Sequence, residues 1–563
     1  MSISFLNSGS GLQTIFFNSQ GGSNRINMFK APLVGFVSAY SYIVPTGAFN
    51  SGAALSFFST EPAGSNVYFA GEFQIQTATP RSFTTSPALY SANLTAGVSP
   101  TPYLLKYNGN GAIVGLSNIS PGTNMSAMRA DPASNVYVVP ATGGGSIYNI
   151  STGDTDPVAT GVGANYNIMK YSPSGAIIAW GGVNLAPPNK TVSSIDFDAG
   201  SNVYITGTYK SATSVAVYNI NGTPGSPTPT TSVSFPPTIT PLAGTGSTWP
   251  YLLKYGPDGI FKGYTLLRVQ GTAAGGGGAV SASSGSIYWV GGAISNIFAN
   301  VNSISTTEPT TNLYSLNTTN TGFSNAFIIK YDMTGALVNF TEWGDGGGRN
   351  SSAGVPVITS SGSFFSQGSW AGGTAVPLNN FGLANPGGTS PTYLPKSSVF
   401  AALTPATGNE ILVLFNSSGV VQGVSQHRDS VPQTTGSSFG LVIDRNDNIY
   451  QAITTGNITI TFYNIGNTSS GVTVPANGQG NNVFIVRFNS SGTVTGYTVI
   501  PGSQTNSGVV IGSDPNYVYV SGIFINNSGA SVSNISSIAS TPVLYTELPT
   551  SAQRSPYFVK WKV

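Results

Sequence analysis

The chain has 563 residues, of which 40% are hydrophobic and 11% aromatic, so it can bury a large core and is not disordered despite its 71 Gly and 36 Pro. Charged residues make up only 7% and the formal net charge is +2, whereas an ordinary soluble domain is roughly 25% charged. The surface must therefore consist mainly of Ser, Thr, Asn, Gln and Gly, and its near-neutral charge argues against nucleic acid and anionic membrane surfaces as partners.

The first 30 residues form an arm with short apolar runs, such as "TIFF", among Gly and Ser. They lack a basic segment followed by a continuous apolar one, so they do not resemble a secretory signal peptide. No stretch of the chain approaches the roughly 18 apolar residues of a membrane-spanning helix. We expect no membrane insertion, and the arm either folds back over the rest of the chain or docks on another protein.

Two short phrases alternate along the rest of the chain, and each occurs seven times. The first ends in an aromatic residue: Asn66-Val67-Tyr68, Asn135-Val136-Tyr137, Asn202-Val203-Tyr204, Ile287-Tyr288, Phe364-Phe365, Asn448-Ile449-Tyr450 and Val518-Tyr519. The second centres on a cation between apolar residues, with one exception that has Leu: Lys106, Lys170, Lys254, Lys330, Leu414, Arg487 and Lys560. Repetition of this kind indicates a repeat architecture.

Both phrases are rich in β-branched and aromatic residues and are bounded by Gly, Asn, Ser and Pro, which is typical of short strands. A turn such as "NGNG", "SPSG" or "GPDG" follows the cation phrase, and a further apolar run such as "AIVGL" completes a hairpin. A run such as "SAMRAD" or "SSIDFD" precedes the aromatic phrase. One unit is therefore four antiparallel strands, named A to D in chain order.

Seven such units predict an all-β fold, a seven-bladed β-propeller of four-stranded antiparallel blades. The chain ends just after the seventh C strand, "YFVKWKV", and the segment "PLVGFVSAYSYI" at 32–43 has the character of the missing D strand. We predict that residues near 33–41 pair with residues near 557–562 and close the ring. The expected domains are the arm, 1–30, and the propeller, 31–563.

From about residue 30 onward, the order "D-x-x-x-N-V-Y-x-x-G" and then "x-F-V-x-K-Y-x-x-x-G" resembles the SBBP-type β-propeller repeats of bacterial surface proteins and large DNA viruses. The resemblance implies the propeller fold and says little about function, because propellers host many activities. Units four and five depart from the pattern. Both lack the turn acid and the Asn before the aromatic residue, and Leu414 replaces the cation in unit five.

The recurring cation could form a functional ring of positive charge, but packing is the favoured interpretation. A C strand lies between two neighbours, so the Lys stem should pack across the blade while the ammonium reaches a turn carbonyl or a turn acid. The candidate partners are Asp131, Asp198, Asp444 and Asp514.

Each unit spans about 80 residues, against roughly 40 to 50 in common propeller repeats, and the surplus lies mainly between strands B and C. Because the strands alternate in direction, we expect all seven B-to-C insertions to leave on one face of the disc. Each insertion contains a tyrosine: Tyr90, Tyr148, Tyr218, Tyr314, Tyr393, Tyr463 and Tyr545. These rings either form a crown that binds sugar or protein, or pack an extra hairpin onto each blade; the second interpretation is favoured.

Residues suited to catalysis are scarce. His427 is the one histidine, and no acid or base accompanies it at a recognisable spacing. The segments "DTD" at 154–156 and "DRNDN" at 444–448 lack the ligand density of a calcium loop, and "GTAAGGGG" at 271 lacks the Lys-Ser/Thr of a phosphate loop. Glycosylation triplets are expected by chance at this composition: Asn93, Asn149, Asn317, Asn457 and Asn534. We predict no catalytic, cofactor-binding or metal-binding residues and no cofactor.

These observations favour a non-enzymatic structural or interaction protein, a rigid propeller platform in a virion or on an extracellular surface. Its partners would be other structural proteins or copies of itself, bound through residues 1–30. The alternative is a carbohydrate-binding propeller that uses the insertion face for attachment to glycans. An enzyme with its site in the axial channel is a third class, disfavoured because such sites usually need convergent acids, His or a metal.

Overall fold

The computed structural model describes about two thirds of the chain, mainly strands and the turns between them. The described residues are 3–7, 13–19, 22–28, 36–45, 57–61, 66–73, 77–83, 94–95, 101–118, 125–140, 148–151, 158, 166–183, 190–210, 215–224, 226, 228–235, 248–269, 278–282, 285–294, 299–307, 314–316, 324–343, 352–370, 375–376, 378–383, 400–401, 409–429, 437–456, 459–474, 481–501, 510–514, 516–526, 531–538, 544–547 and 551–563. Throughout these ranges the regular structure is β-strand.

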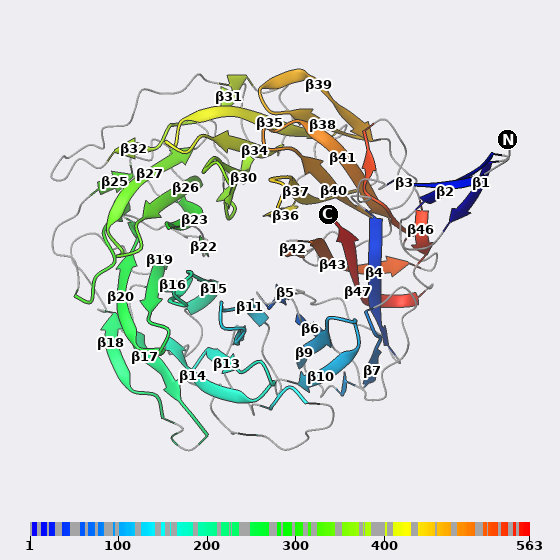
Figure 1. Ribbon diagram of the computed structural model, residues 1–563. Helices are drawn as coiled ribbons and strands as arrows, with labels where there is room; N and C mark the ends of the chain where they lie inside the picture. Colours follow the sequence, from blue (N-terminus) through cyan, green and yellow to red (C-terminus); the bar gives the residue numbers. More distant parts are fainter. Residues whose placement is uncertain are drawn as a thin grey trace.

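Seven four-stranded antiparallel sheets stand in a ring, which makes the protein a seven-bladed β-propeller, as predicted (Figure 1). In the order A to D, blade one consists of β5 (Phe57–Thr60), β6 (Asn66–Phe73), β9 (Thr101–Asn108) and β10 (Ile113–Asn118), and blade two of β11 (Met125–Ala130), β12 (Val136–Pro140), β13 (Ile168–Tyr171) and β14 (Ile177–Val183). Blade three consists of β15 (Lys190–Phe197), β16 (Val203–Lys210), β19 (Thr248–Tyr255) and β20 (Phe261–Leu266). Blade four consists of β22 (Ala279–Ser281), β23 (Ile287–Ile294), β26 (Ser324–Tyr331) and β27 (Leu337–Trp343).

The remaining three blades follow the same order, with strand A of blade five split in two. Blade five consists of β28 (Ser352–Ala353) with β29 (Val357–Ile358), β30 (Phe364–Trp370), β34 (Asn409–Phe415) and β35 (Val421–Asp429). Blade six consists of β36 (Ser437–Ile443), β37 (Ile449–Gly456), β40 (Asn481–Phe488) and β41 (Val494–Pro501). Blade seven consists of β42 (Val510–Asp514), β43 (Tyr517–Asn526), β47 (Ser551–Lys562) and β4 (Phe36–Pro45). The A strands lie nearest the axis of the ring (Figure 1).

The core consists of apolar layers between neighbouring blades. Strand β34 shows why these strands are apolar at consecutive positions. Ile411, Val413 and Phe415 pack into a cluster with blade four, whereas Leu412 and Leu414 pack into a cluster with blade six. A strand buried on both faces must be apolar at every position rather than at alternate ones.

The ring is closed by the N-terminal strand, as predicted. Strand β4 pairs antiparallel with β47, and the register joins Phe36 to Lys562 and Tyr42 to Tyr557. Blade seven therefore takes three strands from one end of the chain and its outer strand from the other.

The B-to-C insertions leave on the face that the alternation of strands dictates, and their described parts then run along the rim. Each of the seven pairs with strand D of the preceding blade, so that every D strand gains a further partner. The insertion strands are β7 (Thr77–Pro80), β8 (Leu94–Thr95), β17 (Val215–Gly222), β18 (Thr231–Phe235), β24 (Ala299–Val301), β25 (Tyr314–Leu316), β31 (Ala375–Val376), β32 (Gly382–Leu383), β33 (Phe400–Ala401), β38 (Ile460–Asn464), β39 (Asn467–Val474), β44 (Ser531–Ser533), β45 (Ser536–Ser537) and β46 (Leu544–Glu547), and β21 (Arg268–Val269) extends blade three to meet β24.

The arm contains a small sheet of its own. Strands β1 (Ile3–Asn7), β2 (Gln13–Ser19) and β3 (Gly22–Met28) form an antiparallel meander and pair with no described strand of the propeller. Figure 1 shows this sheet outside the ring, near β46.

The closing strand pair gives a test of the fold. The side chain of Trp561 in β47 is fully buried, and its Nε1 donates a hydrogen bond to the carbonyl of Ser533 in an insertion. We expect Trp561→Ala to lower the free energy of unfolding by about 3–5 kcal/mol, measured by denaturant titration. Trp561→Phe keeps most of the ring volume and should cost about 1–2 kcal/mol; equal losses for the two variants would contradict the packing described.

Candidate functional site

The turns between strands A and B hold the predicted acids in closed hydrogen-bond networks. The Asp198 carboxylate accepts hydrogen bonds from the backbone of Gly200 and Asn202 and from the Asn202 side chain. It also accepts one from the Tyr204 hydroxyl, 2.9 Å away. Asp444 is held in the same way by Asn448 and Tyr450, and Asp514 accepts from Tyr519. These acids shape turns.

The repeated cations contact tyrosines, and the ion pairs expected with the turn acids are wrong. Each ammonium lies over the ring of the strand-B tyrosine directly opposite it, for example 5.2 Å from the Tyr137 centroid for Lys170 and 5.7 Å from the Tyr204 centroid for Lys254. The tyrosine stands between the cation and the acid, so the two charges interact without contact. The same stacking occurs for Lys106 on Tyr68 and Lys330 on Tyr288, whereas Lys560 lies 5.5 Å from the Tyr519 centroid and closer, 3.7 Å, to that of Tyr517.

The other half of the cation prediction, a turn carbonyl as the partner, is confirmed in two blades. Lys254 donates to the carbonyl of Met333, 2.6 Å away, in the C-to-D turn of the next blade. Lys106 donates to the carbonyl of Pro173 in the corresponding turn of blade two. These two cations therefore tie blade one to blade two and blade three to blade four.

Units four and five now have an explanation. Blade four keeps the pair Tyr288 and Lys330 without an acid, and blade five replaces the pair by Phe365 opposite Leu414. The cation therefore accompanies the tyrosine rather than the acid. In blade six, Arg487 lies opposite Tyr450 and interacts with it, and its Nε also donates a hydrogen bond to Thr495.

Burial dominates the titration of this layer. Desolvation lowers the pKa of Lys254 and of Lys170, and the nearby turn acid opposes this effect in each case. Desolvation likewise raises the pKa of Tyr204, and its contact with Asp198 raises it further. Burial raises the pKa of Tyr288 to about 12 in the blade that lacks an acid.

A second recurring contact fixes each insertion to strand D and the C-to-D turn of its own blade, and we call it the clasp. In blade six, Asn464 Oδ1 accepts a hydrogen bond from the backbone of Val494, and the next residue, Ile465, donates its N–H to the carbonyl of Gly492. The polar clasp residues that accept from strand D are Asn149, Asn219, Ser303, Asn380, Asn464 and Asn534. The clasp residues that donate to the turn glycine are Phe83, Ile150, Ile220, Ile304, Phe381 and Ile465.

The turn glycine is required for two reasons. Gly492 has a φ of +80°, a region that L side chains rarely adopt, and a Cβ there would lie 2.6 Å from side-chain carbons of Ile465. The same two conditions hold at Gly175 against Ile150.

The clasp corrects the equivalence that the sequence suggested among the insertion tyrosines. Tyr148, Tyr218 and Tyr463 precede clasp asparagines, but Tyr314 lies in β25, on a strand beside the clasp, and Tyr545 lies in β46. Tyr90 and Tyr393 are outside the described residues. The repeated signal is Asn or Ser followed by Ile or Phe, which sequence reasoning missed because these residues are common throughout the chain.

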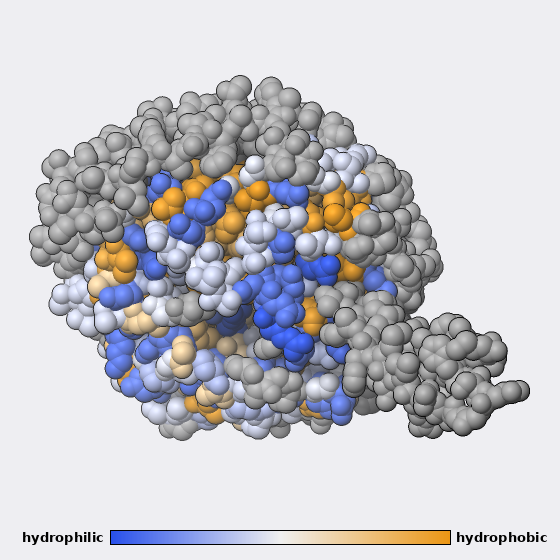
Figure 2. Space-filling view, turned by 45° about the horizontal axis from the view of Figure 1, so that its top comes forward, coloured by the Kyte–Doolittle hydropathy of each residue, from blue (hydrophilic) through white to orange (hydrophobic). Residues whose placement is uncertain are grey.

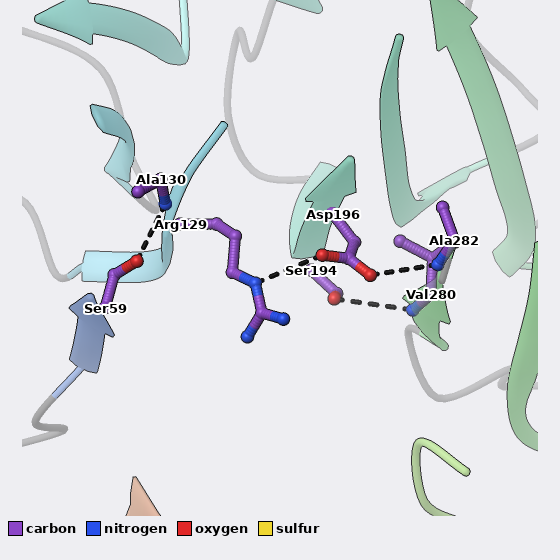
Figure 3. A network of polar contacts seen from close by, with 7 residues as sticks. All are labelled: Ser59, Arg129, Ala130, Ser194, Asp196, Val280 and Ala282. Atoms are coloured by element: carbon purple, nitrogen blue, oxygen red, sulfur yellow. Dashed lines mark hydrogen bonds and ion pairs between the residues drawn. The ribbon is translucent and has the colours of Figure 1, made fainter. Parts of the chain in front are cut away.

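The innermost strands place one residue of each blade at an equivalent position, opposite the strand-B aromatic residue. This inner ring consists of Ser59, Arg129, Asp196, Ser281, Val357, Val442 and Gly512. Figure 3 shows that the first three reach toward the following blade. Ser59 Oγ accepts from the backbone of Ala130, Arg129 Nε lies 3.1 Å from Asp196 Oδ1, and Asp196 Oδ2 accepts from the backbone of Ala282.

Other candidates from the sequence have structural places or lie outside the described set. Asn149 and Asn534 are clasp residues, and His427 lies in β35 opposite Glu410. Segments 154–156 and 271–277, and Asn93, Asn317 and Asn457, are outside the described residues.

The described surface mixes residue types. In the face shown in Figure 2, hydrophilic residues gather across the middle, with hydrophobic patches farther out. Within the described ranges, the His, Asp and Glu side chains form no group of three that could hold a metal ion. A search of the same residues finds no helix with the length and hydrophobicity to span a membrane.

The buried tyrosines predict how stability depends on pH. Burial raises the pKa of Tyr204, Tyr251 and Tyr331 above the ordinary value of 10.0, so they stay protonated in the folded state while the unfolded chain ionises. The free energy of unfolding therefore keeps its whole contribution from these groups below about pH 10. Above this pH it falls by up to about 1.4 kcal/mol per pH unit for each such group. The lysines oppose this trend, because their pKa is lowered on folding, but they are fewer.

Denaturant titrations at several alkaline pH values, with the absorbance of tyrosinate followed in parallel, measure this effect. Most tyrosines should ionise only as the chain unfolds. Reversible ionisation of nearly all tyrosines near pH 10 in a folded protein would contradict the burial described.

No known protein family matches the chain, and no curated protein matches it. Three solved structures resemble it: a phage phi92 endosialidase (9% identity, 96% of this chain and 71% of that one, TM-score 0.33), a mutant of a Synechocystis apocarotenoid oxygenase (10%, 93% and 97%, 0.34) and a Mycobacterium tuberculosis puromycin-hydrolyzing peptidase (10%, 90% and 58%, 0.30). At these identities and scores the likeness says nothing about activity, which must be argued from this chain's own residues.

Proposed function

We propose that the protein is a non-enzymatic structural or interaction protein, a rigid platform that works as a component of a virion or of an extracellular surface. The observation that carries this proposal is the number of ties between blades. Inner-ring contacts, lysine-to-turn hydrogen bonds and the pairing of each insertion with the preceding strand D join neighbours at three distances from the axis. A disc held in this way keeps its shape under load and suits an assembly better than a reaction cycle that needs moving parts.

The acids of the A-to-B turns support the same proposal. Carboxylates used in acid-base catalysis must be able to reach a substrate. The carboxylates of Asp198 and Asp444 are instead surrounded by turn N–H groups and a tyrosine hydroxyl, and both residues are buried.

The arm supplies a surface for assembly. The register of β1–β3 places apolar residues at alternate positions, so that one face of the sheet carries Ile3, Phe5, Ile15, Phe17, Ile26 and Met28. A three-stranded sheet with an apolar face needs a second layer to cover it. A second copy of the same sheet is the occupant we favour, because two identical uncharged faces fit one another about a two-fold axis.

A second candidate is carbohydrate binding at the rim. It is favoured by one observation: the rings of Tyr166 and Tyr218 are partly exposed and meet edge to face, 5.1 Å apart. Aromatic rings that present an apolar face and a polar tip suit a sugar site. Under this hypothesis, Tyr218→Ala would abolish retention of the protein on a glycan array.

Neighbouring phenylalanines give a matched test of assembly through the arm. Phe17 shares the apolar face and Phe16 lies on the opposite one. We expect light scattering to show a dimer for the full-length protein, a monomer for Phe17→Asp, and a dimer for Phe16→Asp, because only the first substitution puts a charge into the covered face. Removal of residues 1–30 should also give a monomer. A wild-type monomer, or loss of the dimer in both aspartate variants, would contradict this arrangement.

A further inference from the structure

We propose that the inner ring contains a binding site for a carboxylate group, formed by the two terminal nitrogens of Arg129. The site is independent of the assembly role proposed above. It would take a small monoanionic organic acid, or the carboxylate of a larger ligand, at the polar side of the axial channel.

The first observation is the asymmetry of the inner ring. Four consecutive positions are polar, Ser59, Arg129, Asp196 and Ser281, whereas the other three are Val357, Val442 and Gly512. A ring built only to hold blades together has no need of charges at two of seven equivalent positions. Burying or confining charged groups has a cost, so a charge at the axis calls for a reason.

The second observation is how Arg129 is held. Its Nε alone contacts Asp196 Oδ1, and Asp196 is fixed in turn by the backbone N–H of Ala282, 2.9 Å from Oδ2. The Arg129 side chain is 56% exposed and that of Asp196 is 10% exposed. The carboxylate is therefore part of the wall, and the guanidinium extends from it.

The third observation is the unused part of the guanidinium. An arginine side chain has five N–H donors, and a structural pair with a carboxylate commonly uses two of them side by side. Here no described residue accepts a hydrogen bond from either terminal nitrogen of Arg129. Figure 3 shows both terminal nitrogens pointing away from Asp196. They form the planar fork that binds a carboxylate through two parallel hydrogen bonds.

Charge decides which anion fits. Arg129 and Asp196 together are neutral. A monoanion can accept two hydrogen bonds from the terminal nitrogens of Arg129 while it stays on the far side of the guanidinium from the Asp196 carboxylate. A dianion such as phosphate would feel the repulsion of Asp196 more strongly. The hydroxyls of Ser59 and Ser194 on the same wall accept from the backbone N–H groups of Ala130 and Val280, which leaves their O–H groups to donate to a polar ligand.

Titration calorimetry on the full-length protein tests the site with paired probes. The acids are methyl glucuronide, for an acidic sugar, and N-acetylglycine, for a peptide terminus; their neutral counterparts are methyl glucoside and N-acetylglycinamide. We expect at least one acid to bind with one site per chain and its neutral counterpart to bind at least about tenfold more weakly, because charge-assisted paired hydrogen bonds are lost. Which acid binds better distinguishes the two sources of carboxylate.

Three variants assign the binding to the fork. Arg129→Gln should weaken the acid at least about tenfold, and Arg129→Lys, which keeps the charge without the fork, about threefold or more. Arg445→Gln is the matched control, because Arg445 lies in a turn of blade six, where it donates to Asn516, and should leave affinity unchanged. Thermal melting confirms that each variant folds; if Arg129→Gln does not fold, Arg129→Lys decides.

Several results would overturn the site. They are the absence of binding by both acids, equal affinity for the neutral counterparts, tighter binding of inorganic phosphate than of either acid, or unchanged affinity in the folded Arg129 variants.

Discussion

The structure depends on one kind of hydrogen bond, in which the outer strand of a blade pairs with an insertion that belongs to the next blade. A propeller blade ends in an exposed D strand whose N–H and C=O groups would otherwise be free to pair with another molecule. Here the insertion of the next blade covers that edge by pairing with it. The clasp asparagine and the following Ile or Phe then fix the same insertion to strand D and to the C-to-D turn of the blade to which the insertion belongs. The long B-to-C insertions, which the sequence analysis placed on one face of the disc, therefore protect the strand edges and join neighbouring blades.

The same principle of shared strands runs through the ring. Strand β4 supplies the outer edge of blade seven, and β7 of the next insertion pairs with β4 in turn. Nearer the axis, Lys254 stacks on Tyr204 within its blade and donates to Met333 of the next. Because the chain has few charges, most of these ties use strand pairing, amides, carbonyls and aromatic rings. Such a disc suits a role in assembly, and its inner ring leaves one arginine fork available for a ligand.

The fold could be predicted from the sequence because each blade repeats two apolar phrases with a turn between them, and the missing seventh D strand could be located by its composition. The partners of the repeated side chains could not. Lys254 and Asp198 both contact Tyr204, and sequence spacing alone does not show that the ring lies between them. The clasp was missed because Asn and Ile are ordinary residues here, and the tyrosine before Asn464 was the more conspicuous signal. The inner ring escaped notice because its seven residues share a register position and not a residue type.

Hydrogen exchange of the native protein tests the central claim most directly, namely that these ties make the ring one cooperative unit. In the C strands of all seven blades, β9, β13, β19, β26, β34, β40 and β47, the slowest amides should exchange with the same free energy, equal to that of global unfolding. Asn464→Ala, which removes one clasp bond, should lower that value in every blade by the same amount, about 1 kcal/mol. Exchange that accelerates only in blades five and six, or blades that open at different free energies in the wild type, would contradict the account.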